Sequence, residues 1–140
     1  MVEHAFVDTS FLVARFNRRD RNHRSAAAFL RQQSEPGAEP LRLVLSDYVF
    51  DETVTTLRIH SRRHEVAVRA GRAIRESQTL KMVRIEVPVF EAAWERFQER
   101  GDKGWSFTDC TSFLLMESLD IRRALSFDDN FRQAGFAVSP

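Results

Sequence analysis

The sequence has a single cysteine, Cys110, among its 140 residues. One cysteine excludes an internal disulfide and a thiolate metal cage, and a buried structural role for Cys110 is favoured over a nucleophilic one. No apolar run approaches the roughly 18 residues of a membrane-spanning helix, and no basic-then-apolar leader is visible. From these absences we expect a cytoplasmic protein that does not contact a membrane.

Lysine is also scarce, because only Lys81 and Lys103 are lysines among the 21 basic residues and the rest are arginines. The formal net charge is only +1. Arginine is the better bidentate phosphate binder, although arginine-rich usage can equally reflect genome composition. Five of the arginines fall in residues 62–78, a predicted helix. A solvated face is the simpler interpretation of this helix, and a nucleic-acid surface is the alternative.

Apolar side chains are plentiful, since 43% of the chain is hydrophobic and twelve residues are phenylalanine. This composition argues against disorder. A chain of this length is expected to form one domain, residues 1–140, and to bury about 70% of its unfolded surface around one core. No internal repeat or low-complexity tract divides it.

Short apolar runs alternate with helical patterns along the chain. The expected strands are residues 4–7, 41–45, 82–87 and 123–127, with a fifth at 136–138. The expected helices are residues 11–16, 22–33, 47–60, 62–78, 88–100 and 106–119. The inward face of the helix 88–100 is expected to consist of Phe90, Ala93, Trp94 and Phe97. The alternation predicts an α/β protein, a three-layer α/β/α sandwich with a central, mostly parallel sheet of four to five strands.

Residues 105–116 (Trp-Ser-Phe-Thr-Asp-Cys-Thr-Ser-Phe-Leu-Leu-Met) predict a buried helix that is entered through Ser106 or Thr108. Asp109 falls in the first turn of this helix, where the helix dipole favours a negative charge. The residues that follow are apolar on nearly all sides. Asp109 is therefore expected at the rim of the core, where a carboxylate needs a partner.

Two further acids, Asp8 and Asp128, each follow a predicted strand. The carboxyl ends of parallel strands form the edge of a sheet where ligands bind. Taken alone, Asp8 would be explained as a helix N-cap. Together with Asp109, however, both acids are expected at one edge of the sheet.

The helix 47–60 carries three acids, and Ser46 is placed to cap it. Asp47 and Asp51 share a polar stripe that is expected to be solvated. Glu52 instead shares a stripe with Tyr48 that is expected to be half-buried. Glu52 is therefore the acid of this helix that is expected to join the others.

Four half-buried carboxylates at one edge cannot all ionise unaided. Two unit charges about 4 Å apart repel by about 4 kcal/mol at an effective dielectric of about 20. Either the pKa values rise or cations compensate the charge. Carboxylate oxygens without a thiolate or a clear histidine ligand favour a hard ion, Mg²⁺ or Mn²⁺. Such an ion can activate water and brace a phosphodiester, so the predicted chemistry is metal-dependent phosphodiester hydrolysis.

Five segments that span nearly the whole chain carry a family resemblance. They are Phe6-Val7-Asp8-Thr9-Ser10, residues 20–23 with Ala26, residues 45–48 leading to Glu52, residues 105–116, and residues 126–131. In this order they resemble the PIN-domain ribonucleases of the VapC toxin type. The resemblance implies a small α/β/α sandwich, an acidic Mg²⁺ or Mn²⁺ site, and cleavage of single-stranded or structured RNA.

The same resemblance implies a role for each acid. It carries Asp8, Glu52, Asp109 and Asp128 over as the acids of the metal site. Our mechanistic hypothesis is that Asp8, Asp109 and Asp128 hold the principal metal ion. Glu52 would act through water or at a second ion. The phenylalanine three places after Asp128 favours Asp128 over its neighbour Asp129 as the fourth acid of the site.

Weaker support roles fall to Ser10, which follows the first acid, and to Thr108, which precedes the third. The resemblance also implies a homodimer and a small antitoxin protein that lays a segment across the acidic groove. His60 and His64 are expected at the surface, and Trp105 is expected in the core or at a hinge rather than stacked on a base.

Other interpretations stay open. A haloacid-dehalogenase-type phosphatase would use Asp8 as a nucleophile, but it requires an acid two residues later, where this chain has Ser10. A PIN-like module could bind RNA or protein without cutting, and the family also contains housekeeping nucleases that are not toxins. The acids could also be helix caps and ion pairs with neighbouring arginines.

Overall fold

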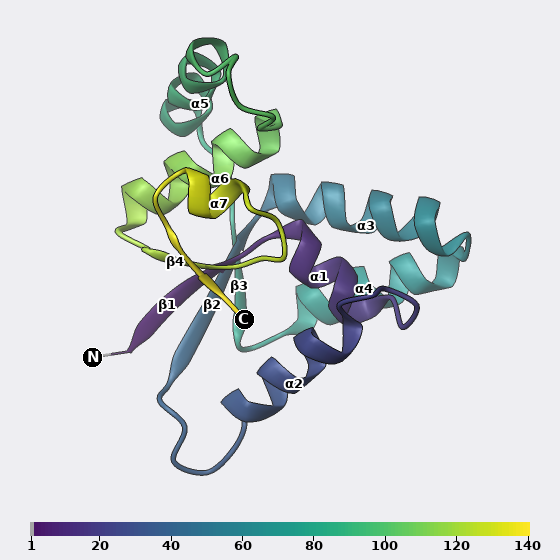
Figure 1. Ribbon diagram of the computed structural model, residues 1–140. Coiled ribbons are helices and arrows are strands. Elements are labelled where there is room, and N and C mark those ends of the chain that lie inside the picture. Colours follow the sequence, from purple (N-terminus) through teal and green to yellow (C-terminus); the bar gives the residue numbers. More distant parts are fainter. Residues whose placement is uncertain (1) are drawn as a thin grey trace.

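Five parallel strands form one sheet in the computed structural model, which describes residues 2–140 (Figure 1). The strands are β1 (Glu3–Val7), β2 (Leu41–Ser46), β3 (Leu80–Val83), β4 (Arg123–Leu125) and β5 (Ala137–Ser139). Their order across the sheet is β3-β2-β1-β4-β5, and each neighbouring pair is parallel. The predicted fold class is therefore confirmed.

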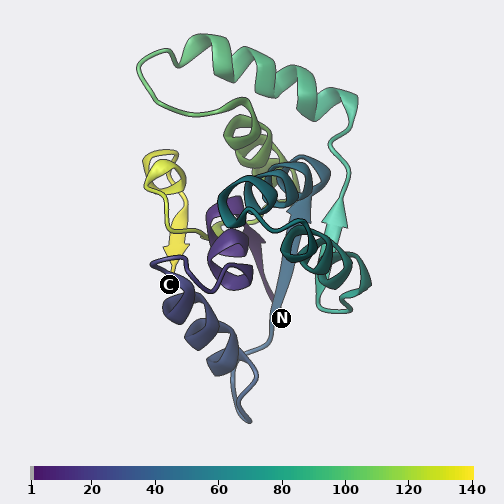
Figure 2. The same cartoon turned by 90° about the vertical axis from the view of Figure 1, so that its right-hand side faces the viewer.

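Within residues 2–140, seven helices flank this sheet. They are α1 (Thr9–Phe16), α2 (His23–Gln33), α3 (Asp47–Ser61), α4 (His64–Glu76), α5 (Val87–Glu99), α6 (Phe107–Leu119) and α7 (Asn130–Gln133). Figure 2 looks onto the layer formed by α1 to α4, while α6 and α7 lie on the other side of the sheet and α5 packs on α6 (Figure 1). The two layers follow from right-handed crossovers, because the chain steps one way from β1 to β3 and the other way from β3 to β5.

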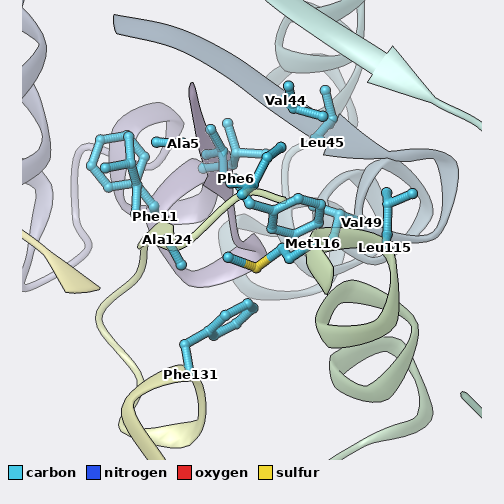
Figure 3. Close-up of a cluster of buried hydrophobic side chains, with 14 of the residues drawn as sticks. Ala5, Phe6, Phe11, Val44, Leu45, Val49, Leu115, Met116, Ala124 and Phe131 are labelled. Carbon is cyan, nitrogen blue, oxygen red and sulfur yellow. The ribbon is translucent and has the colours of Figure 1, made fainter. Parts of the chain in front are cut away.

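The core lies on both sides of the central strand β1 (Figure 3). Phe6 on β1 stacks against Phe131 of α7, with ring centroids 6.2 Å apart. Phe113 of α6 meets the same Phe131 ring edge-on at 5.0 Å. Burial of each side chain of this size contributes about 1.5–3 kcal/mol to the free energy of unfolding. These contacts fix α6 and α7 on the sheet, and both helices begin next to the acids described below.

The third strand is shorter and begins earlier than predicted, since β3 ends at Val83 rather than at residue 87. Its ladder partner β2 ends at Ser46, which is paired with Val83. Beyond that point the backbone N–H of Ile85 donates to Asp47 Oδ1 at 2.8 Å instead of to a strand. The expectation that Asp47 is solvated is wrong for the same reason, because its half-buried carboxylate anchors the connection from β3 to α5.

Two other expectations about helices are corrected. The helix α4 begins at His64 rather than at Arg62, because Arg62 has a left-handed backbone (φ 58°) that ends α3. On α5 only Ala93 is fully buried, whereas Trp94 is 47% exposed. The aromatic side chains of α5 instead pack against the half-buried Phe107, at the start of α6.

No helix within residues 2–140 combines the length and the apolar character that crossing a membrane requires.

Candidate active site

The site begins where the neighbouring strands β1 and β4 end. Val7 and Leu125 are the last paired residues of these strands, so Asp8 and Ser126 follow them side by side. The backbone N–H of Asp8 donates to the Leu125 carbonyl at 3.0 Å, which continues the ladder by one step. Asp8 and Ser126 are both buried, and both lie at the carboxyl edge of the sheet.

One oxygen of the Asp8 carboxylate receives two hydroxyl groups. Ser10 donates to Oδ2 at 2.8 Å, and Ser126 donates to the same oxygen at 2.9 Å. Ser10 also accepts a hydrogen bond from the backbone N–H of Phe127, and Ser126 accepts one from the backbone N–H of Asp128. The two hydroxyls therefore tie the Asp8 carboxylate to the loop that follows β4.

Burial raises the pKa of Asp8 from 3.8 to about 7. The hydrogen bonds from Ser10 and Ser126 oppose this shift, while the charges of Asp109 and Asp128 add to it. A carboxyl group poised near neutral pH in this way is typical of functional sites.

Asp109 is held at the start of α6 by a reciprocal cap. The Ser106 hydroxyl accepts from the backbone N–H of Asp109, and the carboxylate Oδ2 of Asp109 accepts from the backbone N–H of Ser106, both at 3.0 Å. The side-chain amide of Asn130 also donates to this Oδ2 at 3.0 Å. Even so, burial followed by the charge of Asp128 raises the pKa of Asp109.

Glu52 reaches the site from the second turn of α3. Ser46 caps this helix, because its hydroxyl accepts from the backbone N–H of Val49 at 3.0 Å. The half-buried Glu52 carboxyl has a raised pKa, first through burial and then through the charges of Asp109 and Asp128, while the Thr9 hydroxyl lowers it. That hydroxyl oxygen is itself buried without a hydrogen bond of good geometry.

Asp128 and Asp129 are both exposed but face different surroundings. Asp129 pairs with Arg132 at 3.1 Å and accepts from the Gln133 amide at 3.3 Å. Among residues 2–140, no ion pair or hydrogen bond involves the Asp128 carboxylate, and its charge acts on Asp8, Glu52 and Asp109. This arrangement favours Asp128 as the fourth acid.

Within the described chain, no arginine or lysine neutralises these four carboxylates. The ion pairs of residues 2–140 include none of them, and no basic side chain is among the largest contributions to the raised pKa values of Asp8, Glu52 and Asp109. Asp109 does act as a helix cap, as the open alternative supposed. Ion pairing with neighbouring arginines, however, does not explain the cluster.

The donor chemistry of the cluster fits a hard divalent cation. Asp8 and Asp109 are each held through Oδ2, and no hydrogen bond within residues 2–140 reaches either Oδ1. Across the same residues, no three His, Cys, Asp or Glu side chains already converge as a ready metal site. Carboxylate oxygens that form no ion pair with the described chain are nevertheless the donor type that Mg²⁺ and Mn²⁺ prefer, so the chemistry of the residues present fits such an ion.

The other residues singled out from the sequence are placed as follows. Thr108 contributes its carbonyl, which accepts from the hydroxyls of Thr111 and Ser112, so its hydroxyl has no role in these bonds. His60 and His64 are exposed, as expected. Trp105 is buried and donates to the Gln133 side chain, and Cys110 is fully buried, which raises the pKa of its thiol. Both belong to the core, as predicted.

Sequence reasoning missed Ser126, Asn130 and Thr9. A signal for Ser126 was present, because it directly follows the strand paired with β1, just as Asp8 directly follows β1. Asn130 begins the four-residue helix α7, whose position depends on packing of Phe131 against the core, so no local pattern pointed to it. Thr9 lies next to Asp8, but its closeness to Glu52 depends on how α1 and α3 pack.

Comparison with known proteins identifies the family that this chain matches. Residues 5–137 match the family model described as "PIN domain". A curated relative, the "23S rRNA-specific endonuclease VapC20" of Mycobacterium tuberculosis (strain CDC 1551 / Oshkosh), is 35% identical over 133 residues, which make up 94% of each chain.

Solved structures agree with this match. The crystal structure of Mycobacterium tuberculosis VapC20, described as a sarcin-ricin loop cleaving toxin, is 35% identical, covers 97% of this chain and 99% of its own, and has a TM-score of 0.85. VapBC2 from Rickettsia felis, bound to a DNA fragment from the promoter, covers 97% of each chain at 12% identity with a TM-score of 0.69. VapBC-1 from nontypeable Haemophilus influenzae is 14% identical with a TM-score of 0.62, covering 97% of this chain and 96% of its own. The last two show a shared fold alone.

Proposed function

The chain belongs to the PIN-domain family, and on that premise we propose that it is a metal-dependent endoribonuclease and the toxin of a toxin–antitoxin pair. The observation that carries this proposal is the group of four acids, Asp8, Glu52, Asp109 and Asp128, none of which forms an ion pair within residues 2–140, with burial and then the charges of neighbouring acids raising the pKa of Asp8, Glu52 and Asp109. A site of this charge is suited to binding cations and, through them, a phosphodiester.

In this proposal Asp8, Asp109 and Asp128 hold a Mg²⁺ or Mn²⁺ ion, and Glu52 acts through water or at a second ion. The bound ion would supply positive charge to the phosphate and lower the pKa of water beside it. Each acid keeps an oxygen available for this task. Ser10 and Ser126 orient the Asp8 carboxylate, and Asn130 orients that of Asp109, by bonding only to Oδ2.

The substrate class that we propose is a structured segment of ribosomal RNA. A relative that is 35% identical over nearly the full chain is named as a 23S rRNA-specific endonuclease. We propose the cytoplasm as the compartment in which the protein acts, and a small antitoxin as its partner. A homodimer stays a prediction, which light scattering of the purified protein tests directly.

The decisive test combines calorimetry with an RNA-cleavage assay. Titration with Mn²⁺ and then with Mg²⁺ should release or absorb heat, and a ribosomal RNA hairpin should be cut only when metal is present. Asp109→Asn keeps the shape of the side chain and removes its charge, so it should abolish cleavage. The matched control is Asp129→Asn, which removes a charge already paired with Arg132.

An absence of metal heat at millimolar concentration, with RNA still bound, would assign the fold to a binding module that does not cut. Cleavage by Asp109→Asn at the parent rate would remove Asp109 from the site. Because Ser106 and Asn130 can both still donate to the amide oxygen and the repulsion between acids falls, the variant should match or exceed the thermal stability of the metal-free parent. That result would show that lost cleavage does not come from unfolding.

A further inference from the structure

A second charged feature lies at the far end of α1 and α3 from the acids. Two cavities, of about 380 and about 290 Å³, share the lining residues Phe16, Arg18, Val66 and Arg69. Because they share one wall, we treat them as a single hollow, called here the arginine hollow. Its basic side chains are Arg15, Arg18, Arg19, Arg63 and Arg69.

The arginine hollow has no acidic lining residue. Among residues 2–140, Arg63 is the one of these arginines that forms an ion pair, with Glu65 at 2.8 Å on the exposed surface. Arg15, Arg18, Arg19 and Arg69 form no ion pair within the same residues, although the charge of Arg69 acts on the nearby Glu65. These arginines come from two separate segments, the end of α1 with its connection to α2 and the first half of α4, and so place positive charge on two sides of one space.

The rest of the lining is suited to nucleotides. Phe16 and Val66 supply apolar surface, and the Arg15 guanidinium lies 5.4 Å from the centre of the Phe16 ring. The Nδ1 of His23 donates to the Ala14 carbonyl at 2.8 Å, which leaves its Nε2 without a partner among the side-chain hydrogen bonds of residues 2–140. Guanidinium groups bind phosphate oxygens in pairs, and a ring face accepts a base or sugar.

We propose that the arginine hollow binds the sugar–phosphate backbone of the RNA substrate at a distance from the acids. This inference rests on the proposed function for its substrate, but it assigns a separate surface with a separate task. Phosphate contacts of this kind position an RNA and set its affinity without reading its sequence. In this role the hollow would hold a flanking part of the RNA while the acids face the bond to be cut.

The helices give the distance between the two surfaces. α1 begins next to Asp8 and ends at Phe16, and its eight residues span about 12 Å. On α3, the nine steps from Glu52 to Ser61, which also lines the hollow, span about 14 Å. Both helices lie in the layer seen in Figure 2. At about 3.4 Å per stacked nucleotide, this separation is roughly four nucleotides.

RNA fits the hollow better than an amphipathic protein helix does. Such a helix needs a continuous apolar groove, whereas here the apolar lining consists of Phe16 and Val66 among arginines. The basic helix noted in the sequence, residues 62–78, contributes Arg63 and Arg69 to this surface. The arginines of this helix therefore form the hollow only together with Arg18 and Arg19, which lie in the α1–α2 connection.

The test is the double variant Arg18→Gln/Arg69→Gln, because both cavities share these two side chains. Binding of a fluorescent ribosomal RNA hairpin would be measured by anisotropy in EDTA at several salt concentrations. We expect about tenfold weaker binding, and a salt dependence of log K that is shallower by about 2. With metal added, KM for the hairpin should rise by a similar factor, and the loss should grow with RNA length.

The control is Arg31→Gln/Arg42→Gln, which removes the same charge from exposed residues far from the hollow, at the end of α2 and the start of β2. Equal losses in both double variants would overturn the proposal in favour of general charge attraction. Unchanged RNA binding together with lost binding of a poly-glutamate peptide would overturn it in favour of an acidic protein segment. Because binding is measured without metal, a chain that fails to cleave RNA still tests the hollow.

Discussion

The side-chain amide of Asn130 donates to Asp109 Oδ2 at 3.0 Å, and this bond joins the start of α7 to the start of α6. The two residues are separated by 21 positions in the sequence. The bond leaves Oδ1 of Asp109 without a hydrogen bond from the described chain. Asn130 therefore acts on the site by positioning a carboxylate, and it contributes no charge of its own.

We predict that Asn130→Ala weakens metal binding by about tenfold, because loss of a hydrogen bond behind a ligand typically costs 10–100-fold in affinity or activity. The free energy of unfolding should fall by only about 1 kcal/mol. Calorimetry with Mn²⁺ and thermal melts in EDTA measure the two effects. Gln32→Ala, on the exposed side of α2, is the control and should change neither. An Asn130→Ala variant with parent metal affinity would show that Asp109 is oriented by its cap alone.

A second prediction compares Asp128→Asn with Asp129→Asn. Asp128 acts electrostatically on the three other acids, whereas Asp129 is paired with Arg132. We expect Asp128→Asn to reduce RNA cleavage by at least about tenfold and Asp129→Asn to leave it within about twofold. The initial rate of cleavage at saturating Mg²⁺ decides between them. The reverse order of losses would assign the fourth acid to Asp129.

A third prediction concerns the hydroxyl behind Asp8. Ser126 is buried and donates to Asp8 Oδ2. In Ser126→Ala this donor is lost, so the pKa of Asp8 should rise further and metal binding at pH 7 should weaken by about tenfold. Because metal competes with the proton, raising the pH to 8.5 should restore most of the affinity. Ser118→Ala removes a hydroxyl that only bonds to its own helix and serves as the control.

Much of this arrangement could be predicted from the sequence because it depends on local signals. The ends of β1 and β4 placed Asp8 and Asp128 at one edge, and the caps Ser46 and Ser106 were recognised from their positions. Each of these signals lies within a few residues of the feature that it predicts. For the four acids, the sequence predicted that their charge would not be neutralised, but it did not predict which residues donate hydrogen bonds to them.

The sequence-based predictions that were wrong or incomplete concern features that depend on contacts between distant segments. The end of β3 is set by the length of its partner β2, and residue 47 is held by the connection after β3. The exposure of Trp94 follows from the position of α5, which packs on α6 at the margin of the molecule (Figure 1). Asn130 and the arginine hollow likewise arise where separate elements meet. A hydrophobic periodicity or a short sequence motif does not show how separate helices and strands pack together.

The last prediction is a pH dependence of stability in the metal-free protein. The pKa of Asp8 is about 7 in the folded chain against 3.8 for an ordinary aspartate. Between these values the folded state binds more protons than the unfolded state, so stability falls as pH rises from about 4 to 7. At about 1.36 kcal/mol per pKa unit, the contribution lost above pH 7 is about 4 kcal/mol. The raised pKa values of Asp109 and Glu52 act in the same direction.

Urea unfolding of the parent and of Asp8→Asn in EDTA, from pH 4 to pH 8, isolates this contribution from those of other carboxylates. The amide oxygen still accepts from Ser10 and Ser126, so the variant should be close to the parent in stability at pH 4 and increasingly more stable as pH rises. Millimolar Mn²⁺ should reverse the order at pH 8, because only the parent gains the full binding energy of the ion. Parallel curves for the two proteins in EDTA would show that Asp8 is ionised throughout, and the electrostatic argument for a cation at this edge would then lose its main support.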